Sequence, residues 1–152
     1  MPAEIGAPAP DFTLYDQHRN EVSLESLQGR KTLVVFIPFP FTGLCSAEAC
    51  EIRDHLAELN DLDAQVVVIT THALPTNKEW ADQNGFEFPV LADYWPHGAV
   101  ARAYGAFNEA VGAANRATYV LDADGIVREI IATDSLGTVR EYDAYVTALQ
   151  AI

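Results

Sequence analysis

The chain has 152 residues, 49% of them hydrophobic, and its 22 acidic and nine basic residues give a formal net charge of −13. This length is typical of one compact domain, so we expect residues 1–152 to form a single domain. The charge disfavours nucleic-acid binding, because a polyanion would be repelled. No secretory signal is evident, and no apolar run approaches the roughly 20 residues that span a bilayer. We therefore expect a soluble, cytoplasmic protein with no membrane or nucleic-acid partner.

Two apolar runs rich in β-branched residues, residues 31–37 and 65–70, are typical of buried central strands. Between them, residues 44–60 carry apolar side chains at spacings of three and four, which predicts one amphipathic helix. The order strand, helix, strand favours parallel pairing of the two strands through a crossover connection.

The second half of the chain predicts three more helices, over residues 75–84, 99–104 and 139–151. Gly85 is expected to end the first of these, and residues 88–91 follow as a short extended segment. Residues 117–121 and 126–131 flank an Asp-Gly step, which predicts an antiparallel hairpin. These elements predict a three-layer α/β sandwich, with a mixed sheet and helices on both faces. A thioredoxin-like fold fits this architecture, as do several other folds.

Cys45 is expected in the first turn of the first long helix, at the carboxyl end of a central parallel strand. Reactive groups gather at that edge of such sheets. Free N–H groups and the helix dipole there stabilise a thiolate, which is the reactive form of cysteine. Helical phase indicates the opposite role, because Cys45 shares a face with Ala49 and Ile52, as a buried core residue would. These two arguments leave a nucleophile and a core residue equally supported.

Pro38, Thr42 and Cys45 have the spacing Pro-x-x-x-Thr-x-x-Cys at the expected strand-to-helix turn. This motif resembles the signature around the peroxidatic cysteine of peroxiredoxins. The resemblance implies that Cys45 attacks hydroperoxides. It also implies that the Thr42 hydroxyl hydrogen-bonds the thiolate and the peroxide, and that Pro38 shields the thiolate from water.

The resemblance covers nearly the whole chain. Residues 7–14 are similar to the usual opening of the family, and later segments are similar to its alkyl hydroperoxide reductase E group, namely residues 93–100, 104–109 and 114–116. Arg116 occupies the position of the family's arginine, and a guanidinium near Cys45 would stabilise both the thiolate and the charge that develops on the peroxide. Glu48 matches a family glutamate that binds arginine or backbone groups. By itself, Glu48 would be explained as an acidic residue that stabilises the first helical turn.

The function that the resemblance implies is a thiol-dependent peroxidase for hydrogen peroxide, organic hydroperoxides and peroxynitrite. It implies a homodimer and a thioredoxin-like, mycoredoxin-like or glutaredoxin-like reductant. We expect no cofactor, and no metal, because Cys45 and Cys50 lack the spacing of a zinc site and the four histidines are scattered. A peroxide-sensing or thiol–disulfide exchange protein of the same fold is the alternative, although an exchange protein should carry Cys-x-x-Cys. Four aromatic residues would favour organic hydroperoxides if they line the pocket, and otherwise belong to the core: Phe39, Phe41, Trp95 and Phe107.

Cys50 departs from the reductase E pattern, which uses one cysteine. Its spacing from Cys45 resembles bacterioferritin comigratory proteins, in which a resolving cysteine follows the nucleophile by five residues. In an ideal helix the two Cα atoms would lie about 8.6 Å apart, whereas disulfides seldom exceed about 7 Å. Resolution by Cys50 would therefore require the first helical turns to unwind. The alternatives are reduction by an external thiol and a Cys50 that only packs as a small side chain.

Overall fold

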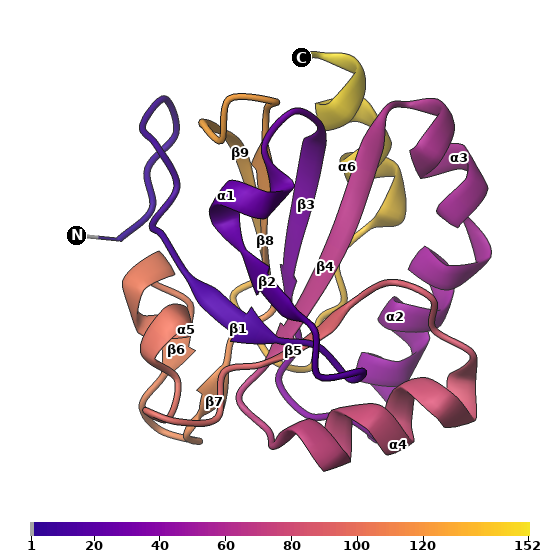
Figure 1. Ribbon diagram of the computed structural model, residues 1–152, viewed down its shortest axis with the longest axis vertical. Coiled ribbons are helices and arrows are strands. Elements are labelled where there is room, and N and C mark those ends of the chain that lie inside the picture. The colour runs from indigo at the N-terminus through magenta and orange to yellow at the C-terminus, as the bar shows by residue number, and fades with distance from the viewer. Residues whose placement is uncertain (1) are drawn as a thin grey trace.

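The computed structural model describes residues 2–152 (Figure 1). Its centre is a five-stranded mixed sheet in the order β5-β4-β3-β8-β9. The strands are β3 (Lys31–Phe36), β4 (Ala64–Thr70), β5 (Val90–Ala92), β8 (Ala117–Leu121) and β9 (Val127–Ala132). β3, β4 and β5 are parallel, whereas β8 runs antiparallel to both β3 and β9. The two central strands, their parallel pairing and the later hairpin are confirmed.

Helices cover both faces of the sheet, so the three-layer α/β architecture is confirmed (Figure 1). One face is covered by α2 (Gly43–Asp54), α3 (Leu56–Asp61), α4 (Leu74–Asn84) and α6 (Tyr142–Gln150), and the other by α1 (Leu24–Leu27) and α5 (Ala99–Tyr104). Side chains alternate between the faces, so that Leu33 and Val35 enter one core cluster and Val34 and Phe36 the other. Because both faces are covered, β3 is apolar almost throughout.

The structure also contains short elements that the apolar pattern does not reveal. β1 (Thr13–Tyr15) and β2 (Glu21–Ser23) form a hairpin, and β6 (Phe107–Asn108) pairs with β7 (Ala113–Ala114). These strands have two or three residues each, too few to show a period of two.

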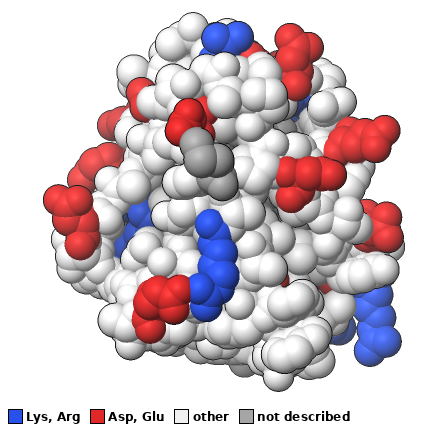
Figure 2. All heavy atoms as spheres, turned by 90° about the vertical axis from the view of Figure 1, so that its left-hand side faces the viewer, with Lys and Arg blue, Asp and Glu red and all other residues white. Residues whose placement is uncertain are grey.

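Acidic side chains are scattered over the surface, as Figure 2 shows for one face.

The single helix expected over residues 44–60 is wrong, because α2 and α3 are separate helices joined at His55. Nδ1 of His55 lies 2.8 Å from the Glu51 carbonyl oxygen, and its ring stacks on Tyr142 with centroids 4.2 Å apart. These contacts hold His55 outside helical geometry, at φ −110° and ψ 15°. The apolar spacing continues across the break, and Leu59 still reaches the core cluster.

The closing helix begins later than expected, at Tyr142 instead of residue 139. Val139 is 37% exposed, whereas the next residue, Arg140, is 5% exposed. The backbone N–H of Arg140 donates to a side-chain oxygen of Glu48, and this bond holds the segment outside the helix. The extended segment expected over residues 88–91 is shifted as well, because β5 covers Val90–Ala92.

The carboxyl ends of β3, β4 and β5 meet at one edge of the sheet, because the three strands are parallel. The loops that leave this edge lead into α2, α4 and α5, and α4 runs along the lower edge in Figure 1. The helix over residues 99–104 is confirmed, and Gly85 ends α4 in the left-handed conformation, with φ 66°. Among residues 2–152, no helix has both the length and the apolar character that a membrane span requires.

We predict that Val120→Ala lowers the free energy of unfolding by about 2 kcal/mol, because Val120 is fully buried in β8 and the substitution leaves a cavity. Val139→Ala is the matched control and should change it by less than about 0.5 kcal/mol, because Val139 lies outside α6. Urea unfolding followed by circular dichroism measures both values. Equal destabilisation by the two variants would contradict this packing.

Candidate active site

Cys45 is the third residue of α2 and has no exposed surface. The N–H groups of residues 43–45 belong to the first turn of α2 and have no intrahelical acceptor, because the first helical bond runs from Ser46 to the Thr42 carbonyl. Cys45 also packs in the same buried cluster as Ala49 and Ile52. Both expected placements are therefore confirmed, because Cys45 lies in the first turn of a helix and also packs in the core.

Thr42 and Pro38 lie in the loop that joins β3 to α2. Thr42 is the N-cap residue of α2, and its Oγ1 donates to the Phe39 carbonyl oxygen at 2.7 Å. Among residues 2–152, no hydrogen bond joins Thr42 to Cys45. To donate to a thiolate, the Thr42 hydroxyl must leave the Phe39 carbonyl. Pro38 is buried two residues after the end of β3.

Glu48, Arg116 and Arg140 form a buried ion cluster one turn after Cys45. Oε1 of Glu48 accepts from Arg116 Nη1 at 2.5 Å and from Arg140 Nη2 at 2.8 Å. Oε2 accepts from Arg140 Nε at 3.0 Å and from the Arg140 backbone N–H at 2.8 Å. The three side chains are 5%, 4% and 0% exposed, respectively. One carboxylate thus faces two guanidinium groups, and the ion cluster carries one uncompensated positive charge.

The protonation states in the ion cluster depend on one another. Burial alone would raise the pKa of Glu48, but hydrogen bonds and charge from Arg140, together with the charge of Arg116, hold that pKa below its usual range. Burial alone would lower the pKa of Arg140, but Glu48 raises it, with further contributions from Tyr145 and Cys45. Glu48 is therefore ionised and Arg140 protonated at neutral pH.

The strand register places Arg116 near the cysteine loop. Arg116 directly precedes β8, whose first residue, Ala117, pairs with Phe36 at the end of β3. Arg116 therefore lies where the chain leaves β3 towards Cys45, and its Nε donates to the Leu136 carbonyl oxygen at 2.6 Å. The structure thus brings Arg116 and Glu48 into direct contact and places both beside the start of α2.

Arg140, Thr118 and Tyr145 were not singled out from the sequence. Nη1 of Arg140 donates to Thr118 Oγ1 at 3.1 Å, and this hydroxyl lies 3.0 Å from the Tyr145 hydroxyl. Thr118 must accept from Arg140, because a guanidinium only donates. The helix expected over residues 139–151 concealed Arg140. The sequence carries one signal for Arg140, the scarcity of basic residues, because only nine Lys and Arg residues occur in the chain.

Side chains of α4 contact α2 at two positions, Ser46 and Cys50. Trp80 Nε1 donates to Ser46 Oγ at 3.0 Å, and Cys50 Sγ lies 3.5 Å from Asn84 Oδ1. Both cysteines are free thiols, and Cys50 is partly buried at the border of the core cluster that contains Cys45. Because the two cysteines lie on one continuous helix, a disulfide between them requires α2 to unwind.

Two of the four aromatic residues near the site are not core residues. Phe41 is 48% exposed and Trp95 is 84% exposed, so a place in the core is wrong for both. The other two are half-buried: Phe39 packs edge-on against His72, and Phe107 against His97. Phe41 and Trp95 lie on loops that leave the same sheet edge, after β3 and β5.

Comparison with known proteins identifies the family of the chain. A family described as AhpC/TSA matches residues 5–130. The chain belongs to the AhpC/TSA family. It is 47% identical to alkyl hydroperoxide reductase E of Mycobacterium tuberculosis over 149 residues, which are 97% of each protein.

Solved structures show the same fold as this AhpC/TSA chain. AhpC of Enterococcus faecalis has a TM-score of 0.89 and 29% identity, with 98% of this chain and 92% of that chain covered. Peroxidoxin BcpB of Mycobacterium tuberculosis has a TM-score of 0.88 and 28% identity, with 99% and 98% covered. The chain is thus a peroxiredoxin of thioredoxin-like fold and a thiol-dependent peroxidase, as the cysteine motif implied.

We predict that Glu48→Gln lowers the free energy of unfolding by about 3 kcal/mol at neutral pH, because it leaves two buried arginines without their carboxylate. The folded pKa of Glu48 is lowered, so its contribution is complete above the unfolded pKa of about 4.3 and is lost as pH falls through the folded value. Denaturant unfolding at several pH values measures the difference in the free energy of unfolding between wild type and variant. It should be constant from about pH 8 to 5 and shrink at lower pH.

The exposed Glu87→Gln serves as the control and should show no comparable difference. If the difference between wild type and Glu48→Gln already shrinks between about pH 7 and 5.5, the pKa of Glu48 is raised and this account of the ion cluster is wrong.

Proposed function

We propose that the chain reduces hydroperoxides with Cys45 as the nucleophile. The Cys45 thiolate attacks the terminal oxygen of the hydroperoxide, and an S–O bond forms as the O–O bond breaks. The alkoxide or hydroxide takes a proton and leaves as an alcohol or water, and Cys45 becomes a sulfenic acid. The observation that carries the proposal is the uncompensated positive charge of the ion cluster beside a cysteine at the start of a helix.

Each neighbouring residue has a distinct role in this step. Arg140 stabilises the thiolate and the charge that develops on the peroxide oxygens, and Arg116 shares this role from the end of β3. Glu48 positions both guanidinium groups without contacting the substrate. The Thr42 hydroxyl donates to the thiolate and the peroxide after leaving Phe39, and Pro38 keeps water from the sulfur.

The substrates we propose are hydrogen peroxide, organic hydroperoxides and peroxynitrite. The similarity to alkyl hydroperoxide reductase E supports the organic class. The reductant is a thioredoxin-like, mycoredoxin-like or glutaredoxin-like protein.

We propose further that Cys50 resolves the sulfenic acid. Its sulfur attacks Cys45, an S–S bond forms, and the sulfenic oxygen leaves as water. This step requires α2 to unwind, which breaks the contacts of Ser46 with Trp80 and of Cys50 with Asn84. The reductant then restores both thiols.

Residues 1–152 act as one cytoplasmic domain in this proposal and assemble as a homodimer. Exposed apolar side chains at the start of α2 and on the loops after β3 and β5 support a dimer: Phe41, Leu44, Tyr94 and Trp95. Sedimentation velocity tests this assembly, and a monomer at all concentrations would exclude it.

Peroxide turnover with a thiol reductant tests the assignment of Cys45. We predict that Cys45→Ser has no turnover, because serine supplies no comparable nucleophile. Cys50→Ser should undergo the first oxidation within about twofold of the wild-type rate, because Cys50 acts only after that step. Rapid mixing with hydrogen peroxide and with an alkyl hydroperoxide, followed by tryptophan fluorescence, measures the first step. Wild-type protein that reacts once and is not recycled by any of the three reductant classes would contradict the enzyme and indicate a sensor.

Mass spectrometry after one equivalent of peroxide tests Cys50. Wild-type protein should lose two hydrogens as the disulfide forms, and Cys50→Ser should gain one oxygen. A stable sulfenic acid in the wild type would show that Cys50 only packs against α4 and that an external thiol reduces Cys45.

A further inference from the structure

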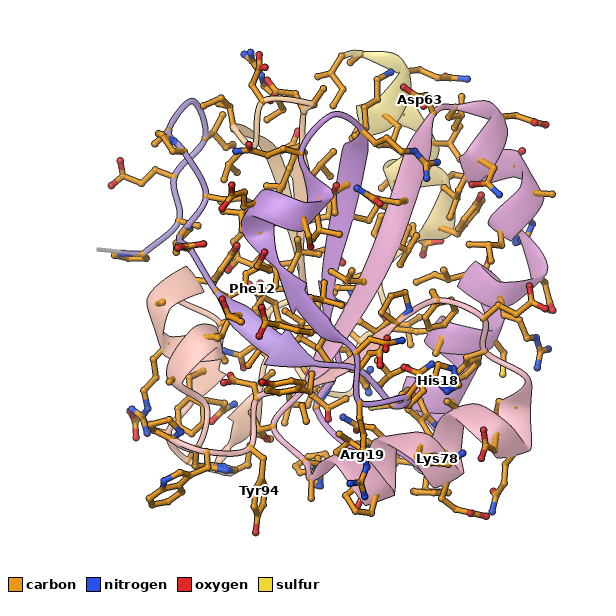
Figure 3. All side chains as sticks on the ribbon, in the orientation of Figure 1. Phe12, His18, Arg19, Asp63, Lys78 and Tyr94 are labelled. Atoms are coloured by element: carbon orange, nitrogen blue, oxygen red, sulfur yellow. The ribbon has the colours of Figure 1, made fainter. Side chains whose placement is uncertain are left out.

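A surface pocket lies outside the Cys45 site, between the turn of the β1–β2 hairpin and the first turns of α4. Its volume is about 300 Å³, and its lining residues are Gln17, His18, Arg19, Leu74, Pro75 and Lys78. Figure 3 shows His18, Arg19 and Lys78 together near the lower edge of the molecule, two from the hairpin turn and one from α4. A histidine, an arginine and a lysine thus surround one hollow in a chain of net charge −13.

Arg19 is the exception among the basic residues. Every other Lys and Arg side chain forms an ion pair with a carboxylate, except Lys31, which donates to the Leu149 carbonyl oxygen. Among residues 2–152, the Arg19 guanidinium has neither partner. With 22 acidic residues in the chain, an arginine left without a carboxylate at the rim of a pocket indicates a partner from outside the chain.

The hairpin turn holds Arg19 in a defined position. Arg19 has φ 65°, in the left-handed region that favours glycine or asparagine. The buried Asp16 carboxylate accepts from the N–H groups of His18 at 2.8 Å and Asn20 at 2.9 Å. Gln17 is 2% exposed. Its Nε2 donates to the Phe88 carbonyl oxygen before β5, and its Oε1 accepts from the N–H of Val90, the first residue of β5. Hydrogen bonds therefore hold the floor of the pocket and the backbone of the turn at its rim, whereas the side chains of Arg19 and Lys78 are exposed.

We propose that this pocket binds a small anion that carries a phosphate or carboxylate group. The Arg19 guanidinium donates two parallel hydrogen bonds to the anionic oxygens. Lys78 supplies a second charge by turning from Asp82, because that pair at 2.7 Å is half exposed on both sides and therefore weak. Leu74 and Pro75 contact the carbon skeleton of the ligand. A dianionic phosphate binds more tightly than a monoanionic carboxylate, because it faces two cations.

Nuclear magnetic resonance titration of the ¹⁵N-labelled protein at constant ionic strength tests the proposal. The probes are inorganic phosphate, glycerol 3-phosphate and acetate, with chloride as the reference ion. Saturable shifts should appear in the amide signals of His18, Arg19 and Lys78, with phosphate and glycerol 3-phosphate binding more tightly than acetate. Arg19→Gln and Lys78→Gln should each raise the dissociation constant by about tenfold.

Arg128→Gln is the matched control, because Arg128 is also exposed but is paired with Asp122, and it should leave the dissociation constant unchanged. Circular dichroism of each variant confirms that the fold is kept, which is expected for exposed side chains. The proposal is overturned if the shifts do not saturate, if chloride produces the same shifts, or if Arg19→Gln and Lys78→Gln bind as tightly as Arg128→Gln. Peroxide turnover is independent of this result, because none of the pocket residues lies in the ion cluster or the cysteine loop.

Discussion

The active site depends on one unbalanced interaction, in which a single buried carboxylate holds two buried guanidinium groups. Glu48 neutralises one of them and fixes the direction of both Arg116 and Arg140. Taking three ions out of water is costly, and the remaining positive charge is tolerated only where an anion can approach it. In the proposed mechanism the Cys45 thiolate is that anion, and the start of α2 adds the free N–H groups of a helix terminus. On this proposal the ion cluster contributes both the charge and the geometry for peroxide attack.

The fold brings together residues that are far apart in the chain. Antiparallel pairing of β8 with β3 carries Arg116 to the strand end from which the cysteine loop leaves. The extended segment before α6 brings in Arg140, whose backbone N–H binds the same carboxylate as its side chain. α4 holds α2 in its helical form through Ser46 and Cys50, and opposes the unwinding that resolution requires. The same contacts thus support the first chemical step and must break in the proposed second one.

The sequence was sufficient to predict the central strands, the hairpin and the position of Cys45, because each depends on local periodicity or on a short motif. It failed where a tertiary contact overrides the local pattern. The helix break at His55 follows from stacking on Tyr142, and the late start of α6 follows from the bonds between Arg140 and Glu48. The role of Arg140 was hidden for the same reason. Helical phase predicted that Cys45 is buried, and its position predicted that it lies in the first turn of a helix. Both predictions describe the same residue correctly.

The most direct test of the charge account is the rate of Cys45 oxidation by hydrogen peroxide in three proteins: wild type, Arg140→Gln and Glu48→Gln/Arg140→Gln. The ion cluster carries one net positive charge in the wild type, none in the single variant and one again in the double variant, where Arg116 remains. The account predicts that Arg140→Gln slows oxidation by about tenfold or more and that the double variant recovers part of that loss. A double variant as slow as Arg140→Gln, or slower, would contradict it.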